Sequence, residues 1–196
     1  MSAIDLVLQL VNPGDLVLVP HDCYGGTFRL LKAKSDRGLF NLQWVNQTDD
    51  KELEEAMAKG PKLVMVETPS NPLMRITDIA KLCEMAKKQG AIVAVDNTFL
   101  SPVCQRPLEL GADLVIHSCT KYINGHSDVV SGAVVAKTKE HADLMKWWAN
   151  CTGITSGAWD SYLTMRGLRT LQVRIKHQQE TTSRLVDFLN AHDRIK

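Results

Sequence analysis

Short, nearly continuous runs of apolar residues recur along the chain, and segments with helical spacing lie between them. The apolar runs are 16–19, 40–45, 63–66, 92–95, 114–116 and 132–136. Runs of this length without polar alternation are typical of strands that are covered on both faces. Turn sequences precede several runs, such as Asn-Pro-Gly-Asp at 12–15 and Gly-Pro at 60–61. Each run is therefore predicted to be a strand.

The segments between these strands have the apolar spacing of helices. Such segments lie at 3–10, 26–35, 139–150, 156–165 and about 170–191. Asp49, with Glu52 three residues later, forms a candidate capping box for another helix. Thr77 is the predicted cap of a helix that Gly90 ends. Strands and helices that alternate with short links predict an α/β fold, a mostly parallel sheet with helices on both faces.

Polar residues collect directly after the predicted strands. These segments are His21-Asp22-Cys23-Tyr24-Gly25-Gly26, Glu67-Thr68-Pro69-Ser70-Asn71-Pro72, Asp96-Asn97-Thr98 and Ser118-Cys119-Thr120-Lys121-Tyr122. The carboxyl ends of parallel strands meet at one edge of a sheet, and open α/β sheets bind their ligands at that edge. The sequence thus predicts a ligand site there.

Composition and charge exclude several classes of protein. The 196 residues include 23 Lys and Arg against 22 Asp and Glu, so the net charge of +1 offers no field to attract nucleic acid or an anionic membrane. No apolar run approaches the ~18 residues of a membrane span, and residues 1–11 lack the features of a signal peptide. The five cysteines are odd in number and form no Cys-x-x-Cys pair, so we expect free thiols, a cytoplasmic location and no metal site. The chain also has neither a P-loop nor a G-x-G-x-x-G motif.

A lysine beside two hydroxyl groups carries the candidate chemistry. Ser118 and Thr120 suit a phosphate, and a partly desolvated Lys121 suits a Schiff base. Asp96 could hold a protonated ring nitrogen, and Tyr24, in a glycine-flanked turn, could lie flat against a ring. Together these requirements describe pyridoxal 5′-phosphate. Other interpretations stay open at this point: Asp96 as a helix cap, Lys121 as a surface cation, Tyr24 as ordinary packing, and the two hydroxyls as turn residues.

Six strings, in order along the chain, resemble the Cys/Met-metabolism family of pyridoxal-phosphate enzymes, which has the aspartate-aminotransferase fold (fold type I). They are Tyr24-Gly25-Gly26-Thr27, Glu67-Thr68-Pro69-Ser70-Asn71-Pro72, Val95-Asp96-Asn97-Thr98, Ser118-Cys119-Thr120-Lys121-Tyr122, Asn124-Gly125-His126-Ser127-Asp128-Val129 and Arg166-Gly167-Leu168-Arg169-Thr170-Leu171. The resemblance implies a cofactor-binding large domain over 1–170. Residues 171–196 would then start a long helix, with solvated charges, that leads to a carboxyl-terminal domain.

The resemblance also implies the roles of the catalytic residues. Lys121 would carry the cofactor as a Schiff base and, once released, would move protons on the substrate. Asp96 would keep the pyridine nitrogen protonated, and Tyr24 would stack on the ring. His126 and Asp128 are expected to order the loop after the lysine.

Further residues are implied in binding the cofactor and the substrate. Ser118, Thr120 and the backbone N–H at Met1 would hold the phosphate. Asn71 would lie near the cofactor's phenolic oxygen and the substrate carboxylate. We therefore expect Asn71 and Tyr24 to be the residues that contact the substrate.

The resemblance implies an enzyme that acts on small amino acids. The string His21-Asp22-Cys23-Tyr24 and residues 117–119 and 147–150 look most like bacterial members that catalyse a γ-replacement in methionine biosynthesis. That reaction joins O-succinylhomoserine, or another O-acylated homoserine, to cysteine and gives cystathionine. A lyase of the same family shares every motif, and a non-catalytic fragment is a second alternative. The family's chains also have an amino-terminal arm and a carboxyl-terminal domain, so we expect this chain alone to be inactive and the full-length enzyme to be a homotetramer.

Overall fold

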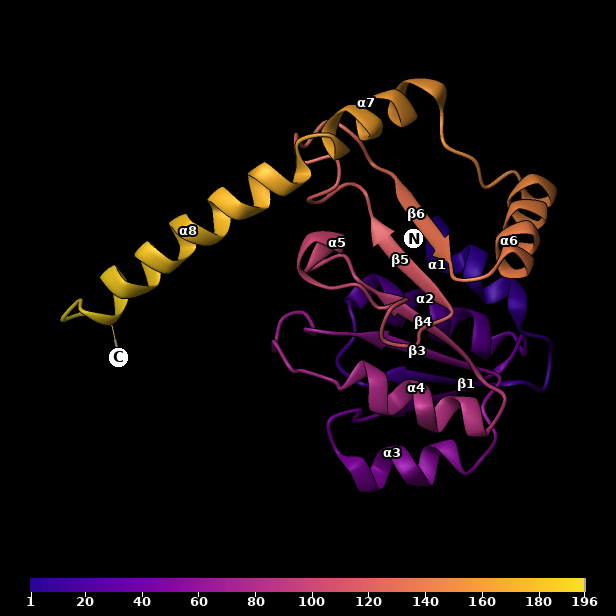
Figure 1. The fold of residues 1–196 in the computed structure, drawn as a ribbon. Helices are drawn as coiled ribbons and strands as arrows, with labels where there is room; N and C mark the ends of the chain where they lie inside the picture. The colour runs from indigo at the N-terminus through magenta and orange to yellow at the C-terminus, as the bar shows by residue number, and fades with distance from the viewer. Residues whose placement is uncertain (196) are drawn as a thin grey trace.

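A six-stranded sheet forms the centre of the protein in the computed structural model, which describes residues 1–195 (Figure 1). The strands are β1 (Leu16–Pro20), β2 (Asn41–Val45), β3 (Leu63–Glu67), β4 (Ile92–Asp96), β5 (Leu114–Ser118) and β6 (Gly132–Ala136). They lie in the order β2-β1-β3-β4-β5-β6, and only β6 runs antiparallel to its neighbour. The prediction of a mostly parallel sheet is confirmed.

Helices connect the strands close to the predicted positions. They are α1 (Ser2–Val7) with the 3₁₀ turn η1 (Leu8–Leu10), α2 (Gly25–Asp36), α3 (Asp50–Met57), α4 (Ile79–Lys88), α5 (Ser101–Cys104), α6 (Lys139–Thr152), α7 (Ala158–Leu168) and α8 (Leu171–Asn190). The short helix α5 was not predicted, because four residues are too few to show a helical period.

Both faces of the sheet are covered, which explains the unbroken apolar runs. On β1, Val17 and Val19 pack in a cluster with α1, α2 and α6, whereas Leu18 belongs to a second cluster with α3 and α4. Figure 1 shows α3 and α4 together on one side of the sheet. Successive side chains of a strand point to opposite faces, so the central strands β1, β3, β4 and β5 are apolar on both faces, whereas the edge strand β2 carries Asn41 and Gln43.

The capping predictions hold only in part. The side chain of Asp49 caps α3 by accepting the backbone N–H groups of the two residues at helix positions 51 and 52. The reciprocal bond of a capping box is absent there, because Glu52 Oε1 accepts from the backbone of Asn46 at 2.9 Å. The prediction of Thr77 as a cap is wrong. Asp78 caps α4, and Thr77 is buried in the preceding loop.

The helix α8 extends away from the sheet (Figure 1). Only its first turns are anchored: Leu171 and Ile175 pack on Cys119 and Ile123 of the segment that follows β5. The helix occupies the predicted range, but the domain division at residue 170 remains a prediction. Within residues 1–195, no helix is both long enough and apolar enough to cross a membrane.

Candidate active site

A cavity of about 310 Å³ opens at the carboxyl edge of the sheet. Its lining includes all seven residues that were predicted to contact the cofactor or the substrate: Met1, Tyr24, Asn71, Asp96, Ser118, Thr120 and Lys121. The parallel pairing of β3 with β4 and of β4 with β5 brings the ends of these strands together. The fold therefore places residues from distant parts of the chain around one space, as predicted from the strand ends.

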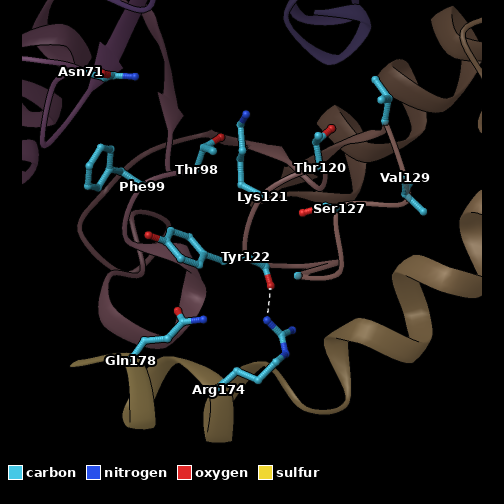
Figure 2. Close-up of a pocket in the computed structure, with 12 residues that line it drawn as sticks. Asn71, Thr98, Phe99, Thr120, Lys121, Tyr122, Ser127, Val129, Arg174 and Gln178 are labelled. Carbon is cyan, nitrogen blue, oxygen red and sulfur yellow. Dashed lines mark hydrogen bonds between the residues drawn. The ribbon is translucent and has the colours of Figure 1, made fainter. Parts of the chain in front are cut away.

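Lys121 lies in the turn that follows β5. Its backbone N–H donates to Ser118 O at 3.2 Å, and its carbonyl accepts from Gly125 N at 2.8 Å. The exposed side chain lines both this cavity and a neighbouring one of about 570 Å³. In Figure 2 it extends between Thr98 and Thr120. A fixed turn thus presents an accessible amine to the cavity.

Asp96 is the last residue of β4 and is half-buried. Its Oδ1 accepts the backbone N–H of Thr98 at 3.0 Å, and Thr98 Oγ1 accepts the backbone N–H of Ser118 at 2.8 Å. These bonds tie the end of β4 to the end of β5. The cap of α5 is Leu100, so the interpretation of Asp96 as a helix cap is wrong.

Tyr24 is the residue before α2; it is 49% exposed and lines the cavity. Gly26 makes room for the ring: a Cβ there would lie 2.5 Å from Tyr24 Cε1 and 2.9 Å from Met1 Sδ. Packing against the core would bury the ring, so ordinary packing does not account for its position. An aromatic face beside the amine and the carboxylate is available to a flat ligand.

The hydroxyl groups are placed to bind an anion. Ser118 ends β5. The Thr120 hydroxyl accepts the backbone N–H of Ser131 at 3.1 Å and donates to the Ser131 carbonyl at 3.3 Å, so its hydrogen would have to turn from that carbonyl to bind an anion. Met1, at the start of α1, lines the same cavity. An amine, a carboxylate, an aromatic ring and two hydroxyls are the groups that pyridoxal phosphate requires, so the residues present fit this cofactor.

Glu67 also lines the cavity, although no role for it was predicted from the sequence. It ends β3 and pairs with Asp96 across the sheet. Its Oε2 accepts the backbone N–H of Tyr24 at 2.8 Å, and its Oε1 accepts that of Asn71 at 3.0 Å. Burial raises the pKa of Glu67 from 4.5 to about 7. The available signal was its position directly after a strand, which it shares with Asp96.

The loop after Lys121 is held from two sides. His126 Nδ1 lies 2.6 Å from the carbonyl of Asn124, and the side chain of Asn124 donates to Asp128 at 2.7 Å. This confirms that His126 and Asp128 order the loop. From the other side, Arg174 of α8 donates to the carbonyl of Tyr122 at 2.8 Å, the bond drawn in Figure 2. Arg174 is thus a structural contact, which corrects the expectation that the charges of this helix are all solvated.

Residues 1–196 match, over their whole length, the family described as Cys/Met metabolism PLP-dependent enzyme. The chain belongs to this family. It is 53% identical over 197 residues to the cystathionine γ-synthase of Escherichia coli (strain K12), covering 100% of this chain and 51% of that protein. It is 42% identical over 199 residues to the cystathionine β-lyase of Coxiella burnetii, covering 100% of this chain and 51% of that protein.

A solved structure of the family matches the fold closely. The cystathionine γ-synthase from Xanthomonas oryzae pv. oryzae, crystallised in complex with aminoacrylate and cysteine, gives a TM-score of 0.96 at 52% identity, over 98% of this chain and 50% of that chain. The predicted family, its cofactor pyridoxal phosphate and fold type I are confirmed. The chain spans about half the length of the curated relatives it matches. Both synthases and lyases are among the relatives, so membership of the family does not by itself specify which reaction is catalysed.

Proposed function

We propose that the enzyme containing this chain is a cystathionine γ-synthase, which joins O-succinylhomoserine, or another O-acylated homoserine, to cysteine. The observation that carries the proposal is that Lys121, Asp96 and Tyr24 line one cavity together with two hydroxyl groups. The higher identity to a γ-synthase, 53% against 42% for a β-lyase, favours synthesis over cleavage. In this reaction the C–O bond at Cγ breaks, the acyl carboxylate leaves with the bonding electrons, and sulfur bonds to Cγ as the thiol loses its proton.

Lys121 and Asp96 would carry the proton chemistry. Pyridoxal phosphate, when bound, supplies an electron sink for the negative charge that develops on the substrate carbons. Lys121 would hold the cofactor covalently through Nζ, and the same amine, once released, would take the proton from Cα and move protons at Cβ. The carboxylate of Asp96 would hold a proton on the ring nitrogen, because an opposite charge at contact distance favours the charged form.

The other lining residues would orient the reactants. The Tyr24 ring would stack on the cofactor ring, and Ser118, Thr120 and the backbone N–H at Met1 would bind the phosphate. Asn71 would lie between the cofactor's phenolic oxygen and the substrate carboxylate. Fixing both ends of the cofactor and one end of the substrate would align the reacting groups and so lower the barrier.

The reaction is tested with the full-length product of the gene. The purified protein is incubated with O-succinylhomoserine and cysteine, and cystathionine is followed by mass spectrometry, with Lys121→Ala as the control. A parallel incubation with cystathionine alone tests the alternative lyases, which would release homocysteine or cysteine together with a keto acid and ammonia. Synthesis of cystathionine that depends on Lys121 supports the proposal. Cleavage without synthesis would contradict it and favour a lyase.

We also propose that residues 1–196 alone are inactive and that the full-length enzyme is a cytoplasmic homotetramer. Large apolar side chains are exposed on α7 and α8, where Trp159 is 69% exposed and Phe188 is 62% exposed. Such surfaces are normally covered by protein. The five cysteines are free thiols, as in a reducing compartment. Light scattering on the full-length protein tests the tetramer, and cell fractionation tests the location. Cystathionine made by residues 1–196, and lost in Lys121→Ala, would contradict the inactivity.

A further inference from the structure

Glu67 joins two parts of the cavity wall that are distant in sequence. Its two carboxylate oxygens accept different backbone N–H groups: Oε2 that of Tyr24, 43 residues away, at 2.8 Å, and Oε1 that of Asn71 at 3.0 Å. Tyr24 directly precedes α2, and Asn71 lies in the loop after β3. These are the residues that the proposed function places against the cofactor ring and the substrate.

We propose that Glu67 is a positioning residue, whose ionised carboxylate sets the spacing of Tyr24 and Asn71 in the cofactor cavity. The inference rests on the proposed function, because it assumes that Tyr24 and Asn71 contact the cofactor and substrate. Only the ionised form accepts at both oxygens with no hydrogen on either. A protonated acid or an amide presents a hydrogen on one side, which would face an N–H group and release one of the two segments.

The charges around Glu67 tie this role to the cofactor. Asp96 on β4 and Asp22 in the β1–α2 loop both disfavour its ionised form, Cys23 lies close by, and Lys121 lines the same cavity. Burial is the larger cause, and together they place the pKa of Glu67 at about 7. A cationic ring held by Asp96 would offset that negative charge and favour ionised Glu67. Cofactor affinity should therefore rise with pH through about 7, and binding should release a proton.

The test compares Glu67→Gln with Glu52→Gln in the full-length protein. Glu52 is a matched control, because its carboxylate also accepts a backbone N–H, from Asn46 at 2.9 Å, but it lies on α3 outside the cavity lining. Pyridoxal phosphate is titrated between pH 6 and 8.5, which gives its affinity. Each titration is repeated in a second buffer of different ionisation enthalpy, and the difference in heat gives the number of protons released on binding. At pH 8.5, Glu67→Gln should weaken affinity about tenfold, the loss expected for one hydrogen bond to a charged acceptor.

The visible circular dichroism of the bound cofactor supplies a second measurement, because it reports how the ring is held. Glu67→Gln should change this signal and remove the step in affinity and proton release near pH 7, whereas Glu52→Gln should match the unmodified protein in both. If Glu67→Gln does not fold, Glu67→Asp retains the charge and should retain the pH step with an altered dichroism signal.

The outcomes separate this inference from the proposed function. Unchanged affinity, pH dependence and dichroism in Glu67→Gln would overturn the role of Glu67, as would a flat pH profile in a folded Glu67→Asp variant. Borohydride reduction and peptide mapping of the unmodified protein test the proposed function separately. Absence of label on Lys121 would overturn the proposed function itself, and with it the inference.

Discussion

A methyl group added at Gly26 should displace the Tyr24 ring and leave the rest of α2 in place. A Cβ at Gly26 would lie 2.5 Å from Tyr24 Cε1 and 2.9 Å from Met1 Sδ. Carbon atoms in good contact lie about 3.5–4.0 Å apart, so the ring must move by about 1 Å. Both neighbouring atoms belong to side chains that can rotate, so the movement is absorbed in the cavity and not by the backbone.

The adjacent glycine provides a matched control. A Cβ at Gly25 would meet only the Arg29 guanidinium, at 3.6 Å, which is an ordinary contact. Neither glycine has a positive φ, and both lie in the first turn of α2. Each alanine should therefore stabilise the fold by about 0.4–1 kcal/mol through the unfolded chain, before any clash is counted. The pair isolates the effect on the Tyr24 ring from the effect on the helix.

The expected loss follows from the stacking energy. An aromatic contact contributes about 0.5–1.5 kcal/mol beyond burial, which corresponds to about a two- to tenfold change in Kd. Pyridoxal phosphate is titrated into the full-length Gly26→Ala and Gly25→Ala variants, with affinity followed by absorbance and folding by thermal unfolding. Gly26→Ala should bind more weakly, and Gly25→Ala should bind as the unmodified protein does. Equal affinity of the two variants would refute the idea that the position of Tyr24 governs cofactor binding.

Three further changes test the cavity. Borohydride reduction should fix the cofactor to the protein as a label, which Lys121→Ala should abolish and Lys137→Ala should keep. Peptide mapping locates the label, and a label on another lysine of the unmodified protein would count against Lys121. Asp96→Asn should retain the cofactor and lose most turnover, because the ring nitrogen is no longer held protonated, and a near-normal kcat would make Asp96 a structural acid only. Folding raises the pKa of Glu67 from 4.5 to about 7, so the folded, cofactor-free protein favours the protonated carboxyl group. The contribution of this group to stability is therefore complete below about pH 4.5 and is lost as the pH rises through about 7. In urea titrations between pH 5 and 8, the free energy of unfolding of the unmodified protein should fall by about 1–2 kcal/mol relative to that of Glu67→Gln, a value reduced for partial solvent exposure. Parallel pH profiles of the two proteins would contradict this.

Local patterns in the sequence were enough to predict the layers of the fold and the edge that carries the site. The central strands are covered on both faces, so their apolar runs are nearly continuous and easily recognised. Lys121 and its neighbouring hydroxyls lie within four residues, so their grouping needs no knowledge of the fold. The carboxyl ends of parallel strands share an edge, which extended the site to Asp96 and Tyr24.

The tertiary structure decided the contacts between distant segments. The bond from Tyr24 to Glu67 spans 43 residues and that from Arg174 to Tyr122 spans 52, and nothing in the local spacing of either pair indicates that they meet. Asp78 and not Thr77 caps α4, and the fold buries Thr77 in the preceding loop, where its backbone N–H donates to Thr68 Oγ1. The periodicity of a sequence reports which side of a strand or helix is buried. The partners of a polar group depend on how the elements pack, and packing decided that the Glu67 carboxylate accepts the backbone N–H groups of Tyr24 and Asn71.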